Sequence, residues 1–574
     1  MKPTLYKTNL PLMTGIVTAT LLLMTGAQAL AAEPARIASC EWRVFDTENV
    51  GGHPQLAAVR IADTQGHDGV CVMIRDGGMN GSLSQKIQND AKYKETASAL
   101  SQSLIGQDAS TPQAIKTIWE QMDANKVGFD LQTAIDLALW DMYGRANGKP
   151  VVDLLGKKRE KVAAHSVTVW PPMYPFNLCK NHQEVVTKYI ELARQAKARG
   201  LRGFKIHAYI NGTWNPVEWR PLKKGERGAF PDLDLEIIRA VYAELGNSMP
   251  LMFDPGFMYN LDEAIRVGKA LDEMKFTWYE DPLPEYADSD ALMKDWITLR
   301  KTVKTPIMGP QEFLGYKARI RWLEAGAADW ARIDVCFGGF TPCLELIRYC
   351  EKHTIQIDLH AVPMMAYMMV CYPITDDATM PWFEFYGSCA SEPVAKEFPG
   401  SAPAPTNSPW FKRMPTRPLD AEGYVHFNPD IPGIGPEADW AWIATHGRNP
   451  FDPNDTTGIA ADPADGFVGV LAGTISANVH DTGFMMTVEK VTAGEESKAK
   501  DASKLVGANL LVGVGAWHKN PDTGAYESPV AVWEVWKSLA KGSKVECPVK
   551  ASLANSGKLV LTLTKAPTIT ENTK

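Results

Sequence analysis

Residues 249–254 (MPLMFD) and 275–280 (KFTWYE) are short apolar runs that each end in a carboxylate, Asp254 and Glu280. Five more runs of this form, each with a polar residue at or just past its end, lie between positions 201 and 385. They are LRGFK (201–205), TPIMGPQE (305–312), ADWARID (328–334), TIQIDLH (354–360) and MPWFEF (380–385). The intervals between the runs suit alternating helices and strands, and this alternation predicts an α/β fold with a parallel sheet.

In a parallel (β/α)8 barrel the carboxyl ends of all strands share one face, so the polar residues at the ends of these runs are expected to converge. They are Lys205, Asp254, Glu280, Glu312, Asp334, His360 and Glu384. Three of them are carboxylates on consecutive runs, and hard oxygen ligands of this kind are those that Mg²⁺ prefers. The sequence therefore predicts a modified TIM-type barrel that is a metal-dependent enzyme.

The segment before the barrel has a different pattern. Three strand-like stretches, ASCEWRVFD (38–46), LAAVRIAD (56–63) and GVCVMIRD (69–76), are followed by helical periodicity that is strongest over residues 131–150. An antiparallel sheet followed by helices indicates a compact α+β domain. We predict an N-terminal α+β capping domain over residues 32–160 and the barrel over residues 161–395.

After the barrel the chain becomes rich in proline and acidic residues. We predict a return segment (396–444) that packs on the capping domain, a linker (445–466) and a small all-β domain (467–574). Five short strand patterns and one helical piece in the last of these indicate a small barrel of the oligonucleotide/oligosaccharide-binding type. An interface role is favoured over a binding role, because the sequence shows no cluster of exposed aromatic residues.

Composition and the first residues indicate the expected partners and the cellular location of the protein. The chain has 574 residues, 45% of them apolar, and a net charge of -8 without a long basic block, so nucleic acid is not an expected partner. Residues 1–31 combine two lysines, an uncharged stretch and small residues at a cleavage position, which is typical of a secretory signal peptide. We expect export, to the periplasm, without stable membrane insertion after cleavage. An uncleaved membrane anchor is the alternative.

Nine cysteines are present without any CxxC pair. Cys343 and Cys350 are seven residues apart, so on a helix their Cα atoms lie beyond disulfide reach. Most of the cysteines are therefore expected to be small buried residues rather than a disulfide framework.

The motifs in their order resemble those of the enolase superfamily, within it the mandelate racemase group. They are AIDLALWDMYGRANGKPVVDLLG (134–156), GFKIHA (203–208), MFDPG (252–256), WYEDPLPE (278–285), GPQEF (309–313), DVCFGG (334–339) and LHA (359–361). The resemblance covers residues 36 to 430. It implies one Mg²⁺ per active site, bound by Asp254, Glu280 and Glu312 on strands three to five. Two positions depart from the family pattern: Pro255 and Gly256 follow Asp254, and Gln311 precedes Glu312.

The same resemblance implies a His–Asp dyad formed by His360 on strand seven and Asp334 on strand six. Imidazole titrates near neutrality, and a carboxylate behind it fixes the tautomer, so the pair suits a general base. Asp358, two residues before His360, is the competing partner. Where the family has Lys-x-Lys on strand two, this chain has Lys205 and His207, which leaves open whether a second base acts. Glu384 resembles the strand-eight acid that hydrogen-bonds the intermediate.

Together these residues suit removal of the proton α to a carboxylate, which creates an enediolate that a divalent cation stabilises. The expected reaction is dehydration of an acid sugar to a 2-keto-3-deoxy acid, and the expected partner is therefore a small-molecule carboxylate substrate. Racemisation or epimerisation of a 2-hydroxy acid is the alternative. A third hypothesis is that the chain is an exported binding protein without catalytic activity. We also expect a homo-oligomer. Loops at residues 47–55 and 76–82 are expected to close over the barrel mouth and set specificity.

Overall fold

The structure is a computed structural model. It describes residues 35–571 except 51–52, 74–82, 169, 172–175, 210–213, 224–225, 312–314, 361–363, 386–408, 416–417, 428–429, 456, 458–466, 480–482, 500, 514–517, 520–525, 528–540, 554–558 and 565–566. The predicted signal peptide (1–31) and Glu312 therefore lie outside the described residues. So do the whole predicted loop at 76–82 and part of the loop at 47–55.

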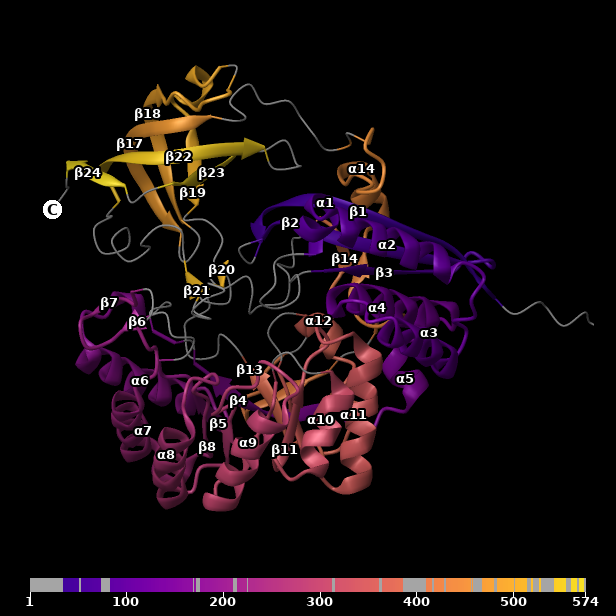
Figure 1. Ribbon diagram of the computed structural model, residues 1–574, viewed down its shortest axis with the longest axis vertical. Coiled ribbons are helices and arrows are strands. Elements are labelled where there is room, and N and C mark those ends of the chain that lie inside the picture. The colour runs from indigo at the N-terminus through magenta and orange to yellow at the C-terminus, as the bar shows by residue number, and fades with distance from the viewer. Residues whose placement is uncertain are drawn as a thin grey trace, which may run out of the picture. The chain divides into compact units, whose positions relative to one another are not determined.

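The N-terminal domain is a three-stranded antiparallel sheet with helices packed against it (Figure 1). Its strands are β1 (Ile37–Val50), β2 (His53–Asp63) and β3 (Asp68–Val72), and its helices are α1 (Leu83–Asn89), α2 (Ala91–Leu104), α3 (Pro112–Ala124), α4 (Phe129–Ala146) and α5 (Val151–Leu155). Helix α4 packs so closely on β3 that a side chain would not fit at Gly69. A Cβ added there would lie 2.1 Å from the carbonyl oxygen of Ala138. This domain confirms the predicted α+β cap.

Eight parallel strands form the barrel, in the order β12-β11-β10-β9-β8-β5-β4-β13. They are β4 (Lys161–Val167), β5 (Gly203–Ile206), β8 (Leu251–Phe253), β9 (Trp278–Glu280), β10 (Ile307–Met308), β11 (Trp330–Ile333), β12 (Gln356–Leu359) and β13 (Trp382–Phe385). Strands β12 and β13, at the two ends of this order, lie next to each other and nearly close the barrel. The predicted modified TIM-type barrel is therefore confirmed.

Helices surround the strands (Figure 1). They are α6 (His182–Ala198), α7 (Pro231–Leu245), α8 (Leu261–Met274), α9 (Asp290–Thr302), α10 (Tyr316–Glu324) and α11 (Phe340–His353), with the short α12 (Met365–Met368) before β13. Local sequence fixes their ends: Asn260 and Glu263 form a capping box at the start of α8, and Asn181 caps α6. Cys343 and Cys350 are buried on α11, as the sequence predicted.

Helix α4 of the cap is joined to the loop between β11 and α11 by buried polar contacts. The Asp136 carboxylate accepts hydrogen bonds from the backbone N–H (2.9 Å) and the hydroxyl of Thr341. Gly339 in this loop has φ +102°, and a Cβ there would lie 2.4 Å from an Asp136 oxygen, so only glycine fits. Thr133 and Trp119 donate to the carbonyl oxygens of the same loop. The cap therefore sets the position of the chain that leaves Asp334.

The segment after the barrel returns to both domains. Strand β15 (Tyr424–His426) pairs antiparallel with β4 of the barrel, and β14 (Phe411–Arg413) pairs with β16 (Glu437–Ala438). Helix α14 (Trp440–His446) follows, and Arg448 exchanges backbone hydrogen bonds with Val44 of β1.

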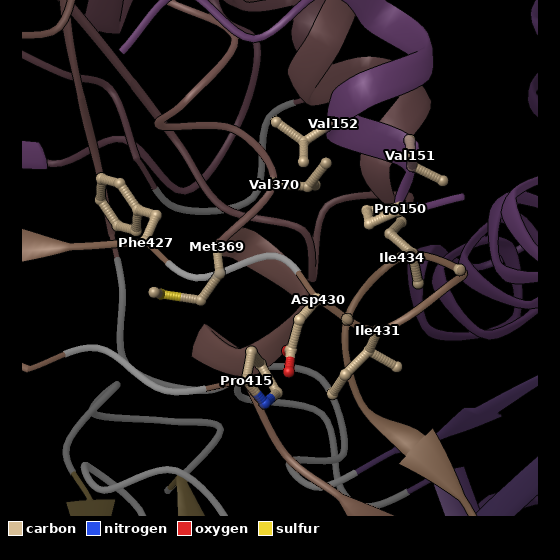
Figure 2. A pocket seen from close by; sticks show the side chains of 12 residues that line it. Pro150, Val151, Val152, Met369, Val370, Pro415, Phe427, Asp430, Ile431 and Ile434 are labelled. Carbon is tan, nitrogen blue, oxygen red and sulfur yellow. The ribbon is translucent and has the colours of Figure 1, made fainter. Parts of the chain in front are cut away.

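A small apolar cavity of about 30 Å³ lies where this segment meets residues 150–152 (Figure 2). Asp430 is the charged residue among those that line it. A volume of this size has room for about one water molecule. The cavity contains none of the predicted site residues.

The C-terminal domain holds a six-stranded sheet in which one strand, β24 (Thr568–Glu571), pairs outside a closed ring formed by the other five. They are β17 (Val468–Val479), β18 (Gly483–Ala493), β19 (Asn509–Gly513), β22 (Lys544–Leu553) and β23 (Leu559–Leu563). The order is β17-β18-β19-β23-β22, and β22 pairs with β17 to close the ring, with β19 and β23 parallel. The small all-β domain expected from the sequence is confirmed, and the helical piece expected near residues 531–540 lies outside the described residues.

Among the described residues, no helix has both the length and the apolar character needed to cross a bilayer.

The buried Asp136 predicts a pH-dependent stability. Burial raises the pKa of Asp136 to about 7 despite the hydrogen bonds from Thr341, so the folded state holds a proton that the unfolded chain releases near pH 4. The contribution of this residue to stability therefore falls as pH rises from about 4 to about 7. Asp136→Asn should show a smaller decrease in Tm between pH 5 and pH 8 than the wild type.

Differential scanning calorimetry measures this decrease. Asp123→Asn, which removes a carboxylate paired with Lys317 on the surface, should retain the wild-type pH dependence. An unchanged decrease in the Asp136→Asn variant would show that this carboxyl does not titrate in the folded protein.

Candidate active site

The interior of the barrel is arranged in layers because side chains on a strand alternate. Met252, Trp278, Met308 and Trp330 form one apolar layer, with Trp382 packed against it. Two residues further along three of these strands stand charged residues, Glu280, Arg332 and Glu384. The next step along β11 brings Asp334. The aromatic layer therefore forms the floor beneath the polar residues that the sequence placed at the strand ends.

Lys205 lies at the centre of the charged layer. Its Nζ donates to both oxygens of Glu280 at 2.9 Å and to Oε1 of Glu384 at 2.5 Å, and lies 3.9 Å from Oδ2 of Asp254. The side chains of Lys205, Glu280 and Glu384 are fully buried. Three of the predicted carboxylates are thus brought together around one ammonium group.

Arg332 was not identified from the sequence. It lies on β11 two residues before Asp334 and contacts Glu280, Glu384 and Asp358. A usable signal was present in the run ADWARID, because an arginine inside an otherwise apolar strand, two positions from a predicted catalytic aspartate, points to the same side of the strand. His165 on β4, 3.6 Å from Asp358, was missed too, and no pattern around it marks it as a site residue.

The electrostatics of this cluster follow from burial and charge. Burial opposes ionisation of Asp254, but His207, Lys205 and Arg332 outweigh it and lower its pKa to about 2. Burial and the neighbouring carboxylates raise the pKa of Glu280 more than Arg332 and Lys205 lower it. A further positive charge at this carboxylate would favour its ionised form.

His360 and Asp334, the two residues of the predicted dyad, lie in contact. His360 Nδ1 lies 2.8 Å from Oδ2 of Asp334, and the other oxygen of Asp334 accepts a hydrogen bond from the N–H of Cys336 at 2.6 Å. Asp358, the competing partner, instead binds Arg332 at 2.6 Å. The contact with Asp334 occupies Nδ1, so a further partner would have to meet the ring at Nε2. His360 is 17% exposed, whereas the charged layer beneath it is sealed.

His207 lies between two hydrogen-bond acceptors. Its Nδ1 is 2.6 Å from the carbonyl oxygen of Thr168, and its Nε2 is 2.8 Å from Oδ2 of Asp254. Both ring nitrogens are therefore engaged by groups inside the site. In this arrangement His207 supports Asp254.

The donor set of the predicted metal site fits a hard cation. Oxygens of Asp254 and Glu280 lie 3.9 and 2.9 Å from the same ammonium nitrogen of Lys205, so both already face one positive charge. Glu312, the third predicted ligand, lies outside the described residues. Within the part of the chain that the structure describes, no three His, Cys, Asp or Glu residues complete a metal shell.

A capped (β/α)8-type barrel with converging carboxylates and a His–Asp pair at its strand ends defines the class of protein. Two family models match the chain: the mandelate racemase/muconate lactonizing enzyme N-terminal domain over residues 45–156, and the enolase C-terminal domain-like family over residues 188–442. The chain therefore belongs to the enolase superfamily, in its mandelate racemase/muconate lactonizing enzyme branch.

The chain is similar to several named proteins in sequence or in fold. The chain is 24% identical over 335 residues to L-talarate/galactarate dehydratase of Salmonella typhimurium, covering 57% of this chain and 73% of that protein. It is 27% identical over 348 residues to D-galactarolactone cycloisomerase of Agrobacterium fabrum, covering 58% and 79%. The crystal structure of D-glucarate dehydratase from Agrobacterium tumefaciens complexed with magnesium superposes with a TM-score of 0.52 at 22% identity, covering 72% and 99%. At this identity the superposition establishes the fold.

The buried cluster predicts a large cost for removing Lys205. Lys205→Met leaves Glu280 and Glu384 with less compensating charge in the sealed layer, and breaking a buried pair costs about 3–5 kcal/mol. Adding Glu384→Gln should recover part of that loss. Denaturant unfolding followed by circular dichroism measures both variants.

Lys317→Met, which breaks a surface pair with Asp123, is the matched control and should cost ~1 kcal/mol or less. Equal stabilities of the Lys205→Met and Lys317→Met variants would contradict the cluster as described.

Proposed function

We propose that this protein is a Mg²⁺-dependent enzyme that abstracts the proton α to a carboxylate, and that its reaction is dehydration of an acid sugar to a 2-keto-3-deoxy acid. The observation that carries the proposal is the contact between His360 and Asp334 at the ends of β12 and β11, above a layer of carboxylates. Membership in the family and relatives named as acid-sugar dehydratases support the substrate class.

The side chains of this chain divide the work of that reaction. Nε2 of His360 takes the α-proton, and Asp334 holds the ring orientation and stabilises the imidazolium that forms. The protonated His360 then gives a proton to the departing β-hydroxyl, which leaves as water, and the resulting enol tautomerises to the 2-keto acid. Bound Mg²⁺, held by Asp254, Glu280 and Glu312, would supply positive charge where the enediolate develops.

Racemisation or epimerisation remains the second candidate, because such reactions need a base on each face of the substrate. Lys205 and His207 are the residues for that role, but Lys205 is buried against two glutamates and both nitrogens of His207 face acceptors. These contacts favour a single base and therefore dehydration. A non-catalytic binding protein would not require the Asp334 contact that orients His360.

The dyad is tested by His360→Asn. The variant should lose abstraction of the α-proton, with a decrease in kcat on the order of 10²-fold or more, because it has no imidazole to accept the proton. Asp334→Asn should lose less, since the imidazole remains with a wrong tautomer preference. The measurements are 2-keto acid formation from a panel of acid sugars and deuterium incorporation at the α-carbon in D₂O.

His353→Asn, a histidine at the exposed end of α11, is the matched control and should retain wild-type rates. Unchanged turnover in the His360→Asn variant would overturn the catalytic assignment. Continued exchange of the α-proton of the opposite enantiomer with solvent, in the His360→Asn variant, would favour racemisation.

The metal is tested by Glu280→Gln. Replacing a charged ligand with a neutral amide should weaken Mg²⁺ binding, measured by isothermal titration calorimetry, and abolish Mg²⁺-dependent turnover. Asp254→Asn is the second ligand variant, and Glu244→Gln, which breaks a surface pair with Arg194, is the control. Full activity of the wild type after exhaustive chelation would contradict the metal requirement.

A further inference from the structure

Arg332 makes more contacts with the charged layer than its place in a strand requires. Its Nε donates to Oε1 of Gln311 at 2.9 Å, and one terminal nitrogen donates to Asp358 at 2.6 Å. The other terminal nitrogen lies 2.7 Å from Oε1 of Glu280 and 2.9 Å from Oε1 of Glu384. The guanidinium therefore joins side chains from the ends of β9, β12 and β13 and from the loop that follows β10.

All of these contacts are sealed from solvent. The side chains of Arg332, Glu280, Asp358 and Glu384 are fully buried, so Arg332 cannot touch a substrate at the barrel mouth. A guanidinium is planar and offers five donors in a fixed fork, whereas an ammonium is a compact point charge. A rigid fork that binds several carboxylates fixes their relative positions as well as neutralising them.

We propose that Arg332 is the positioning residue of this active site: it holds the metal-ligand carboxylate Glu280 and the strand-eight carboxylate Glu384 in register beneath the dyad. The inference rests on the proposed Mg²⁺-dependent function. Residues that orient ligands from behind typically affect metal affinity or activity 10–100-fold. Gln311 accepts a further hydrogen bond from the same guanidinium, through Nε of Arg332.

A comparison of Lys205 with Arg332 distinguishes the effect of charge on the layer from the effect of geometry. It contacts the same two oxygens, Oε1 of Glu280 and Oε1 of Glu384, and contributes an equal charge. It makes no contact with Asp358 or Gln311 among the interactions that the structure describes. A lysine at position 332 would keep the net charge of the layer, but one nitrogen cannot reproduce the three-nitrogen fork. A charge-conserving substitution therefore tests positioning alone.

The experiment compares Arg332→Lys with the wild type, using MgCl₂ as the calorimetric probe. The Kd for Mg²⁺ should rise about 10- to 100-fold, and kcat should fall by a similar factor while KM changes less than threefold or so, because substrate contacts remain. Arg159→Lys is the matched control. Arg159 makes three hydrogen bonds, to Tyr372, Thr375 and Asp377, away from the site, and its replacement should lower Tm without changing the Kd for Mg²⁺.

Two results would overturn the inference: a wild-type Kd and kcat in folded Arg332→Lys, or a lowered Tm with an unchanged Kd. If Arg332→Lys does not fold, Asp358→Asn decides, because it releases the anchor of Arg332 without touching Glu280. A several-fold rise in the Kd for Mg²⁺ then supports the inference and an unchanged Kd overturns it. Failure of the wild type to bind Mg²⁺ would instead remove the proposed function on which the inference rests.

Discussion

The contact of two buried cations with shared glutamate oxygens is the constraint on which the barrel interior depends. Lys205 and Arg332 both bind Oε1 of Glu280 and Oε1 of Glu384, in a layer with no solvent exposure. Isolated charges in such a place would be very costly, so the four groups are stable only together. The strands that carry them, β5, β9, β11 and β13, are therefore held by side-chain electrostatics in addition to their backbone hydrogen bonds.

The strand period connects this cluster to the chemistry above it. Trp278, Trp330 and Trp382 fill the floor, the charged residues stand two positions later, and the dyad residue Asp334 stands two positions after Arg332. Each step moves one layer toward the mouth, from apolar packing through sealed charges to the partly exposed His360. This gradient lets the barrel keep a stable core while it leaves the His360 side chain partly exposed at the strand ends.

The capping domain fixes the chain that follows Asp334. Thr133 and Trp119 bind the loop that joins β11 to α11, and Asp136 binds Thr341 in the first turn of α11. The glycines at 338 and 339 are required there because Cβ atoms would collide with cap side chains. The cap therefore positions Asp334 through the backbone, in addition to the substrate specificity that loops of such domains are expected to set.

Much of this protein could be predicted from sequence alone. Apolar runs ending in polar residues predicted the barrel, and the resemblance paired His360 with Asp334. These features are local, because they depend on the periods of strands and helices. The role of Arg332, the contacts of His207 and the pairing of Asp358 with Arg332 depended on tertiary structure. Their partners come from strands far apart in the chain, and closure of the barrel alone decides which oxygen each nitrogen meets.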